Sequence, residues 1–124
     1  MAVDAEGDFL TAFLADEPDQ PVVMLNLLRF AEGGRDLYQQ YAKAFGEQIA
    51  PRFGVEVVYA GDGTSALIAE PGQQWDAVLL VRYPSRKDFA RMITDPQYQQ
   101  ISHLRSKALS EAVLQPTRPW SRRP

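Results

Sequence analysis

The stretch PVVMLNLLRF, residues 21–30, decides the fold of this chain. Pro21 opens it, and every later residue of the stretch is apolar except Asn26 and Arg29. Side chains of a β-strand point alternately to its two faces. One face would carry Val22, Met24, Asn26, Leu28 and Phe30, and the other Val23, Leu25, Leu27 and Arg29. Apolar residues on both faces predict a strand that is covered on both sides.

The stretch WDAVLLVRY, residues 75–83, is also apolar on both faces. An antiparallel sheet with one face in water would alternate apolar and polar residues instead. Helices of the same chain can cover one face, so another layer must cover the second. We expect this layer to be a second copy of the chain, packed sheet to sheet as a homodimer. The alternative is a monomer whose leading helix and C-terminal tail cover that face.

Periodicity and turn residues divide the rest of the chain into elements. Helices are predicted over residues 4–15, 35–52, a short segment around 89–93, and from Pro96 to about Ala112. Strands are predicted over residues 21–30, over 54–61 with a continuation at 65–69 after a bend, over 75–83 and over 113–119. Ser85 and Asp88 after Pro84 predict a capping box, and Asp95 before Pro96 predicts a second helix start.

Without the leading helix, the order of elements is strand, helix, strand, strand, helix, strand. This order predicts an α+β, ferredoxin-like βαββαβ domain, with an antiparallel sheet and helices on one face. We assign residues 1–20 to an N-terminal helix and linker and residues 21–116 to the domain. Residues 117–124 are basic and rich in proline, and we expect them to form a flexible tail.

The composition argues against several classes of function. The net charge of −3 gives no sign of nucleic-acid binding. With no cysteine and one histidine, the chain is not expected to hold zinc, an iron–sulfur cluster or a disulfide. No nucleotide-binding glycine motif, signal peptide or membrane-spanning run is visible. We therefore expect a soluble, cytoplasmic protein that uses no metal or cofactor and binds neither nucleic acid nor membrane.

Three stretches of the chain carry a family resemblance. VVMLNLLRF, WDAVLLVRYPSRKDFARMITDPQYQ and HLRSKAL resemble the family called domain of unknown function 1330, from Pro21 to about Pro116. The elements RYPSR and DPxY together make the resemblance specific. It implies a dimeric α/β barrel, in which the sheets of two ferredoxin-like protomers pair. That superfamily includes antibiotic-biosynthesis-type monooxygenases, dehydratases, isomerases, haem enzymes and ligand-sensing domains, whose ligands often lie between sheet and helices.

Asn26 is the polar exception on one face of the opening strand. A buried amide without hydrogen-bond partners costs about 1–3 kcal/mol. Either backbone groups or a buried water satisfy it, or it lies in the cleft between sheet and helices and donates to a ligand oxygen. The second interpretation requires Asn26 to face the helices, which the sequence leaves open.

Arg105 interrupts an apolar face of the last predicted helix, formed by Tyr98, Ile101, Ala108, Leu109 and Ala112. Either its stem packs on the core while the guanidinium reaches solvent or a carboxylate, or it binds a carboxylate, enolate or phenolate ligand. His103 lies away from this face, and we expect it in solvent. A role for His103 in ligand or haem binding is the lesser alternative.

Aromatic residues are expected to border the same cleft. Tyr83, just before Pro84 at a strand end, is the best placed to offer its hydroxyl group to a ligand. The other candidates are Tyr41, Tyr59, Trp75 and Tyr98. Most of these rings are equally explained as part of the core.

Together these residues predict a homodimer with one small-molecule pocket in each protomer. As an enzyme it would catalyse a cofactor-independent oxygenation, isomerisation or dehydration. Asn26 and Arg105 would stabilise anionic charge, and Tyr83 would orient the ligand or donate a proton. One alternative is a metabolite-binding or sensing module, which the lack of a convincing nucleophile or base favours. The other is a structural dimer without a ligand.

Overall fold

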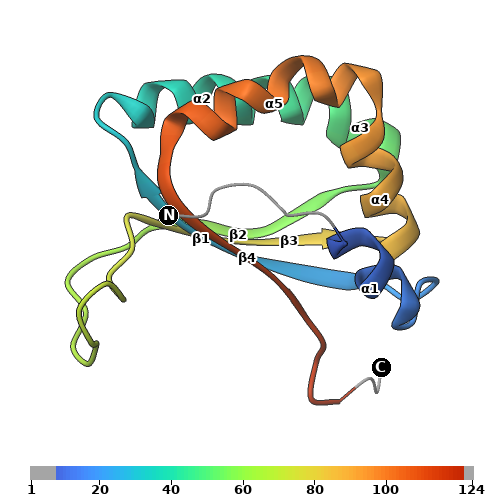
Figure 1. The fold of residues 1–124 in the computed structure, drawn as a ribbon, viewed down its shortest axis with the longest axis horizontal. Coiled ribbons are helices and arrows are strands. Elements are labelled where there is room, and N and C mark those ends of the chain that lie inside the picture. Colours follow the sequence, from blue (N-terminus) through green and yellow to red (C-terminus); the bar gives the residue numbers. More distant parts are fainter. Residues whose placement is uncertain (1–7, 122–124) are drawn as a thin grey trace.

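A computed structural model describes residues 8–121 of the chain (Figure 1). Its elements are α1 (Phe9–Ala15), β1 (Val22–Phe30), α2 (Gly34–Ala44), the π-helical turn η1 (Phe45–Ile49), α3 (Ala50–Phe53), β2 (Glu56–Asp62), β3 (Ala77–Tyr83), α4 (Arg86–Thr94), α5 (Pro96–Ala108) and β4 (Leu109–Thr117). The predicted α+β, ferredoxin-like order is confirmed. Residues 4–7 of the predicted leading helix and 122–124 of the predicted tail lie outside the described residues.

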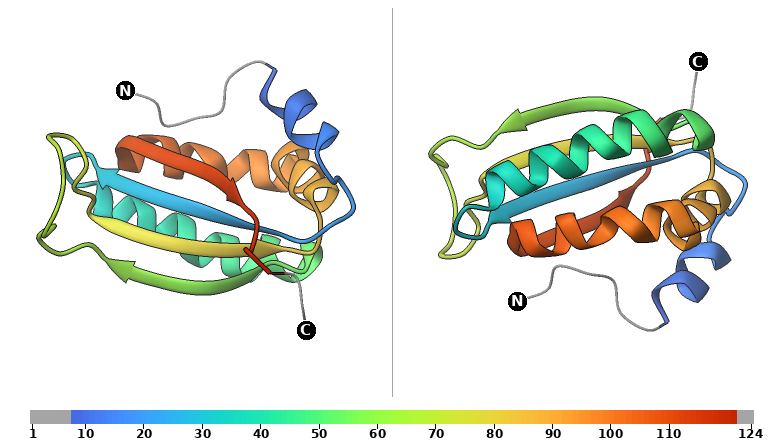
Figure 2. Two further views of the ribbon diagram at one scale, coloured as in Figure 1. Left: turned by 90° about the horizontal axis from the view of Figure 1, so that it is seen from below. Right: turned by 90° about the horizontal axis from the view of Figure 1, so that it is seen from above.

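The strands form one antiparallel sheet in the order β2-β3-β1-β4. β1 pairs with β3 on one side and with β4 on the other, so the opening stretch is a central strand. Helices α2 and α5 lie side by side over one face of this sheet (Figure 2). We call the opposite face the outer face. No helix or strand of residues 8–121 covers it (Figure 1).

The two faces of β1 differ in burial. Its helix-side residues are Val22, Met24, Asn26 and Leu28, and all of them are buried. Val23, Leu25, Leu27 and Arg29 lie on the outer face and are partly exposed. Asn26 therefore faces the helices, which answers the question that the sequence left open. A second copy of the chain over the outer face stays a prediction.

Both predicted helix starts are confirmed. The Ser85 hydroxyl oxygen accepts the Asp88 backbone N–H at 3.0 Å, and the hydroxyl donates to the Asp88 carboxylate at 2.9 Å. The Asp95 carboxylate accepts the backbone N–H groups of Gln97 at 3.0 Å and Tyr98 at 3.3 Å. Pro96 occupies the first turn of α5, where a missing N–H costs no helical hydrogen bond. These caps fix where α4 and α5 begin.

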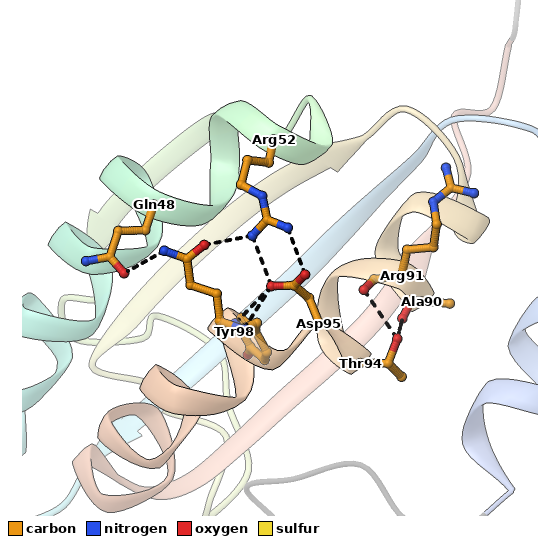
Figure 3. A network of polar contacts seen from close by, with 8 residues as sticks. Gln48, Arg52, Ala90, Arg91, Thr94, Asp95 and Tyr98 are labelled. Atoms are coloured by element: carbon orange, nitrogen blue, oxygen red, sulfur yellow. Dashed lines mark hydrogen bonds and ion pairs between the residues drawn. The ribbon is translucent and has the colours of Figure 1, made fainter.

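Arg52 ties the end of α3 to the start of α5 (Figure 3). Its guanidinium donates to both carboxylate oxygens of Asp95, at 3.0 and 2.8 Å, and to the side-chain oxygen of Gln97 at 2.8 Å. Gln97 in turn donates to Gln48 at 3.2 Å. The hydrogen bonds from Arg52 lower the pKa of Asp95 from 3.8 to about 2.

We expect Asp95→Asn to remove an acid-sensitive part of the stability. The folded pKa of Asp95 lies below the unfolded one, so its contribution is complete above about pH 4 and is lost as the pH falls toward 2. Between pH 4 and 2, the urea midpoint of the wild type should therefore fall more steeply than that of Asp95→Asn. Parallel falls in the two proteins would contradict this assignment.

The predicted strand over residues 65–69 is wrong. Residues 63–76 form a loop without regular secondary structure, and β3 begins at Ala77 rather than at Trp75. A strand needs a neighbour to accept and donate its backbone hydrogen bonds. Here β2 pairs with β3 and leaves residues 65–69 without a strand partner in the described part of the chain. The side chains of Leu67 and Ile68 consequently project into solvent.

The predicted helix end near Ala112 is also wrong, because α5 ends at Ala108 and β4 begins at Leu109. The carbonyl of Ala108 accepts the backbone N–H of Ala31 at 2.8 Å. Gly34 packs so closely here that a β-carbon on it would lie 2.0 Å from that carbonyl oxygen. The chain leaves the helix at this point because β4 pairs with β1 from Val23 to Phe30, and this pairing outweighs the helical pattern.

Helix α1 packs against α4 through aromatic rings. The ring of Phe13 lies 5.4 Å from that of Phe9 and 5.4 Å from that of Phe89. Arg86 donates to the Phe13 carbonyl at 3.1 Å, and its guanidinium lies 4.6 Å from the centre of the Phe13 ring. These contacts hold α1 beside α4 and bring Phe9 to the cavity described next.

Candidate functional site

A cavity of about 720 Å³ lies between the sheet and helices α4 and α5. This volume is ordinary for a small-molecule site. Its lining residues are Phe9, Asn26, Tyr41, Tyr83, Phe89, Met92, Ile93, Tyr98, Gln99, Ser102, Arg105, Ser106, Ala112, Val113 and Leu114. The structure thus brings together Asn26, Arg105, Tyr83, Tyr41 and Tyr98, which the sequence singled out. We call this space the cavity.

Helix α5 supplies most of the polar wall of the cavity. Tyr98, Ser102, Arg105 and Ser106 follow one another at helical spacing and share one face of α5. The Asp95 cap fixes the start of α5 and therefore helps to determine which face of this helix is turned toward the sheet. Ile101 and Ala108 of the predicted apolar face are buried, and the adjacent face of α5 carries hydroxyl groups and a guanidinium to the cavity.

Asn26 lies at the centre of the sheet wall. In register it stands between Leu79 of β3 and Leu114 of β4, and it is 9% exposed. Its amide nitrogen donates to the carbonyl of Met24 at 3.3 Å. That bond uses one of two amide hydrogens, so the side chain keeps hydrogen-bonding capacity for a ligand.

Tyr41 and Tyr98 face each other across the junction of α2 and α5. Their hydroxyl oxygens are 3.0 Å apart, and their rings meet edge to face with centres 6.3 Å apart. Burial raises the pKa of Tyr41 well above its usual value, and the neighbouring Tyr98 adds to this effect. Tyr41 is therefore neutral near pH 7, and its hydroxyl group can donate a hydrogen bond.

Tyr83 comes from the end of β3 and is 6% exposed. Its ring packs edge to face against Phe89 with centres 4.9 Å apart. Burial raises the pKa of Tyr83, whereas the positive charge of Arg105 acts to lower it. The same charge acts to lower the pKa of Tyr38, which burial also raises. The positive charge of Arg105 thus acts on the buried hydroxyl groups of both Tyr38 and Tyr83.

One charged side chain is among the described residues that line the cavity. It is Arg105, and the rest of the described lining contains no Asp, Glu, Lys or His. In a partly buried site a charge acts more strongly than it does in water. The cavity therefore combines an apolar body with a wall of hydrogen-bond donors that includes a guanidinium.

Tyr59 and Trp75, which were expected to border the cleft, are not among the residues that line the cavity, and neither is His103, the lesser candidate for ligand binding. Tyr59 lies on β2 and is 55% exposed; its hydroxyl lies over Gly61 on the outer face. Trp75 lies in the 63–76 loop, with the Arg29 guanidinium 4.5 Å from its ring centre. His103 is on the solvent side of α5, as the helical spacing predicts.

Sequence reasoning missed the residues that complete the cavity. Ser102 and Ser106 lie four residues apart on the face that Tyr98 and Arg105 mark, so helical spacing offered a signal for them. Phe9 had no such signal, because α1 precedes the ferredoxin-like order and its docking site depends on tertiary contacts.

Two structural features bear on cofactors and membranes. Within residues 8–121 no group of three or more His, Asp or Glu side chains is arranged to hold a metal ion. In the same range no helix is both long enough and apolar enough to cross a bilayer.

The fold places the chain among ferredoxin-like α+β proteins, and one solved structure of this fold is described as dimeric. The model of the family described as "Domain of unknown function (DUF1330)" matches residues 32–115, and the chain belongs to this family. A comparison with curated proteins found no match.

Several solved structures resemble this one. The RPA0582 protein of unknown function from Rhodopseudomonas palustris is 28% identical, with a TM-score of 0.85 over 96% of this chain and 97% of that one. Hydroxynitrile lyase from Passiflora edulis is 15% identical, with a TM-score of 0.60 over 81% and 94%. A dimeric ferredoxin-like protein of unknown function from Bacteroides fragilis is 12% identical, with a TM-score of 0.55 over 78% and 94%. The last two share the fold alone.

Proposed function

We propose that the cavity binds a small organic anion, whose carboxylate, enolate or phenolate oxygen is held by Arg105. The observation that carries this proposal is the set of hydrogen-bond donors in the lining. The guanidinium of Arg105 lines the cavity together with amide and phenol hydroxyl groups. The oxygens of an organic acid accept hydrogen bonds from such donors, and the apolar part of the acid fits against Phe89, Met92 and Leu114.

The uncharged polar groups support the same ligand class. The raised pKa values of Tyr41 and Tyr83 keep both phenols protonated at neutral pH, so they act as donors rather than as bases. Asn26 adds an amide that can donate to a second ligand oxygen. A wall made of donors favours an electron-rich oxygen over a cation.

Binding without turnover is the form of the proposal that the lining favours most directly. A general base near pH 7 needs a His, a carboxylate, a Lys or a thiolate within reach of the substrate. None of these is among the described lining residues. A catalytic role would therefore suit a substrate whose C–H bond is acidic enough for solvent water to accept the proton. Arg105 and Asn26 would then stabilise the anion formed, Tyr83 would orient it or return a proton, and no cofactor would be needed.

We also propose that two copies of the chain pack through their outer faces. Leu25 and Leu27 of β1 pair with Leu80 and Val78 of β3 and form an apolar, partly exposed patch on that face. A second copy packed sheet to sheet would bury such a patch, and two-fold dimers are the commonest oligomers of soluble proteins. The dimeric neighbour of the same fold supports this arrangement.

A thermal-shift screen tests the ligand class. Small aromatic and aliphatic acids are compared with their matched carboxamides, which keep the shape and lose the charge. We expect some acids to raise Tm by several degrees, because a ligand at about a hundred times its Kd adds roughly 2.7 kcal/mol of stability. Equal shifts for acids and amides, or no shift for any acid, would contradict the proposal.

The best acid from this screen also separates a binder from an enzyme. Turnover of that acid, lost in Asn26→Leu or Arg105→Leu variants that still fold, identifies an enzyme. Binding without turnover identifies a binding or sensing module. If no acid in the screen binds and none is turned over, the protein is a structural dimer in which these residues serve packing alone.

A further inference from the structure

The loop of residues 63–76, which we call the arm, extends from the end of the sheet where β2 finishes and β3 begins. Figure 1 shows it projecting past the outer face, on the side opposite to α2 and α5. At its tip, Leu67 is 101% exposed and Ile68 is 96% exposed. Loops of this length without regular structure are uncommon in small domains and are often functional.

The base of the arm is fixed by backbone hydrogen bonds. The N–H of Gly63 donates to the carbonyl of Asp76 at 2.9 Å, and the N–H of Asp76 donates to the carbonyl of Leu28 at 2.8 Å. The Asp76 carboxylate accepts the N–H of Phe30 at 2.9 Å. A β-carbon on Gly63 would lie 2.0 Å from the Trp75 carbonyl oxygen, so this close return of the chain requires glycine.

Arg29 reinforces the base from the outer face. It forms a salt bridge with Glu111 at 3.0 Å and donates to the carbonyls of Gly72, at 2.9 Å, and Gln74. Its guanidinium also stacks on Trp75 at 4.5 Å. The charged residue that interrupts the apolar pattern of β1 therefore orients the arm. An arm anchored in this way holds its apolar tip in a defined place.

The composition of the arm indicates what its tip contacts. Residues 63–76 contain no Lys or Arg, and they carry the acidic residues Glu70 and Asp76. A segment that binds anionic lipid needs basic residues beside its apolar ones. A protein surface is therefore the better match for Leu67 and Ile68.

A second copy of this chain provides that surface. The apolar patch of the outer face extends from Leu25 and Leu27 to Val78 on β3, and Arg29 separates it from the end of the sheet that carries the arm. Because the arm projects past this face, a second sheet laid over the face must have the arm beside it. By two-fold symmetry each copy then receives the arm of the other.

We propose that the arm clasps a second copy of the chain and buries Leu67 and Ile68 against it. This inference rests on the proposed homodimer and adds the element that fixes it.

Sedimentation over a dilution series tests the clasp with three proteins. They are the wild type, Leu67→Ser with Ile68→Ser, and the control Thr64→Ala with Ser65→Ala, which truncates two exposed polar side chains of the same arm. We expect the dimer Kd to rise at least tenfold in the serine variant and to stay unchanged in the control. Both changes are at exposed side chains, so circular dichroism should show folded protein in each case.

The outcomes separate the clasp from the dimer. A wild-type dimer with the same Kd as the serine variant overturns the clasp and leaves the dimer standing. A wild type that is monomeric at all concentrations overturns both proposals.

A cross-linking experiment locates the tip directly. The chain has no cysteine, so Ile68→Cys carries one thiol to which a photoactivated cross-linker can be attached. Mixed with unlabelled wild type, it should give a product of twice the 13.9 kDa chain mass after irradiation. Cross-links found only within the labelled chain would overturn the proposal.

Discussion

Arg105→Leu is expected to weaken the binding of an organic acid by about 10- to 150-fold. A hydrogen bond to a charged group contributes about 1.5–3 kcal/mol, and leucine removes both the charge and the donors. Binding of the matched carboxamide should change much less, because the uncharged amide forms no ion pair with Arg105. Calorimetric titration of both ligands against both proteins measures the difference.

Lys107→Leu is the matched control for this variant. Lys107 lies on the same helix and is exposed, so the substitution removes one positive charge from α5 without changing the lining of the cavity. Acid affinity should stay within about twofold of the wild type, because exposed charges are screened by solvent and salt. Equal losses of acid affinity in Arg105→Leu and Lys107→Leu would show that the positive charge of α5 attracts the acid without a specific contact in the cavity.

Leu28→Ala is expected to lower the free energy of unfolding by about 2–5 kcal/mol, because it opens a cavity in a fully buried part of the core. Leu28 is 0% exposed and packs in a cluster with Ala77, Ala108 and Leu109, away from the ligand cavity. Urea unfolding at several protein concentrations measures the change, which should not depend on concentration.

Leu27→Ala makes the same truncation on the outer face of the same strand. Within one chain Leu27 is only partly buried, so its effect on the isolated protomer should be smaller. In the proposed dimer the loss instead depends on protein concentration, because association is weakened. A concentration-independent loss in Leu27→Ala as large as that in Leu28→Ala would contradict the assigned faces of β1.

The sequence was sufficient for the fold because local signals and the sheet pattern agreed. Apolar residues on both faces of residues 21–30 identified a central strand, and the structure places it between β3 and β4. Capping residues Ser85 and Asp95 located the starts of two helices. Which face of β1 met the helices was not predictable, because neither face was polar enough to exclude burial.

The remaining errors come from tertiary contacts that short patterns do not record. Residues 65–69 have the composition of a strand, yet β2 pairs with β3 and the arm is held by its base. Residues 109–112 continue a helical pattern, yet they belong to β4 because they pair with β1. Tyr59 and Trp75 have aromatic side chains suited to a ligand site, but topology places them outside the cavity.

The candidate site was predictable in part for the same reason. Asn26 and Arg105 were conspicuous because each interrupts an apolar pattern, and both line the cavity. Ser102 and Ser106 interrupt no apolar pattern and are marked only by their helical spacing from Tyr98 and Arg105. Phe9 had no signal in the sequence. Arg29 interrupts a pattern as well, yet it anchors the arm. A polar residue in an apolar strand therefore marks a specific contact without showing which kind.

The proposed function requires that the cavity hold an organic anion through Arg105. A crystal structure of the wild-type protein with the best acid from the screen tests it most directly. We expect the acid group within about 2.7–3.2 Å of the Arg105 guanidinium, with the rest of the molecule between Asn26 and α4. An acid bound outside the cavity, or bound inside it with its charged group turned away from Arg105, would contradict the account.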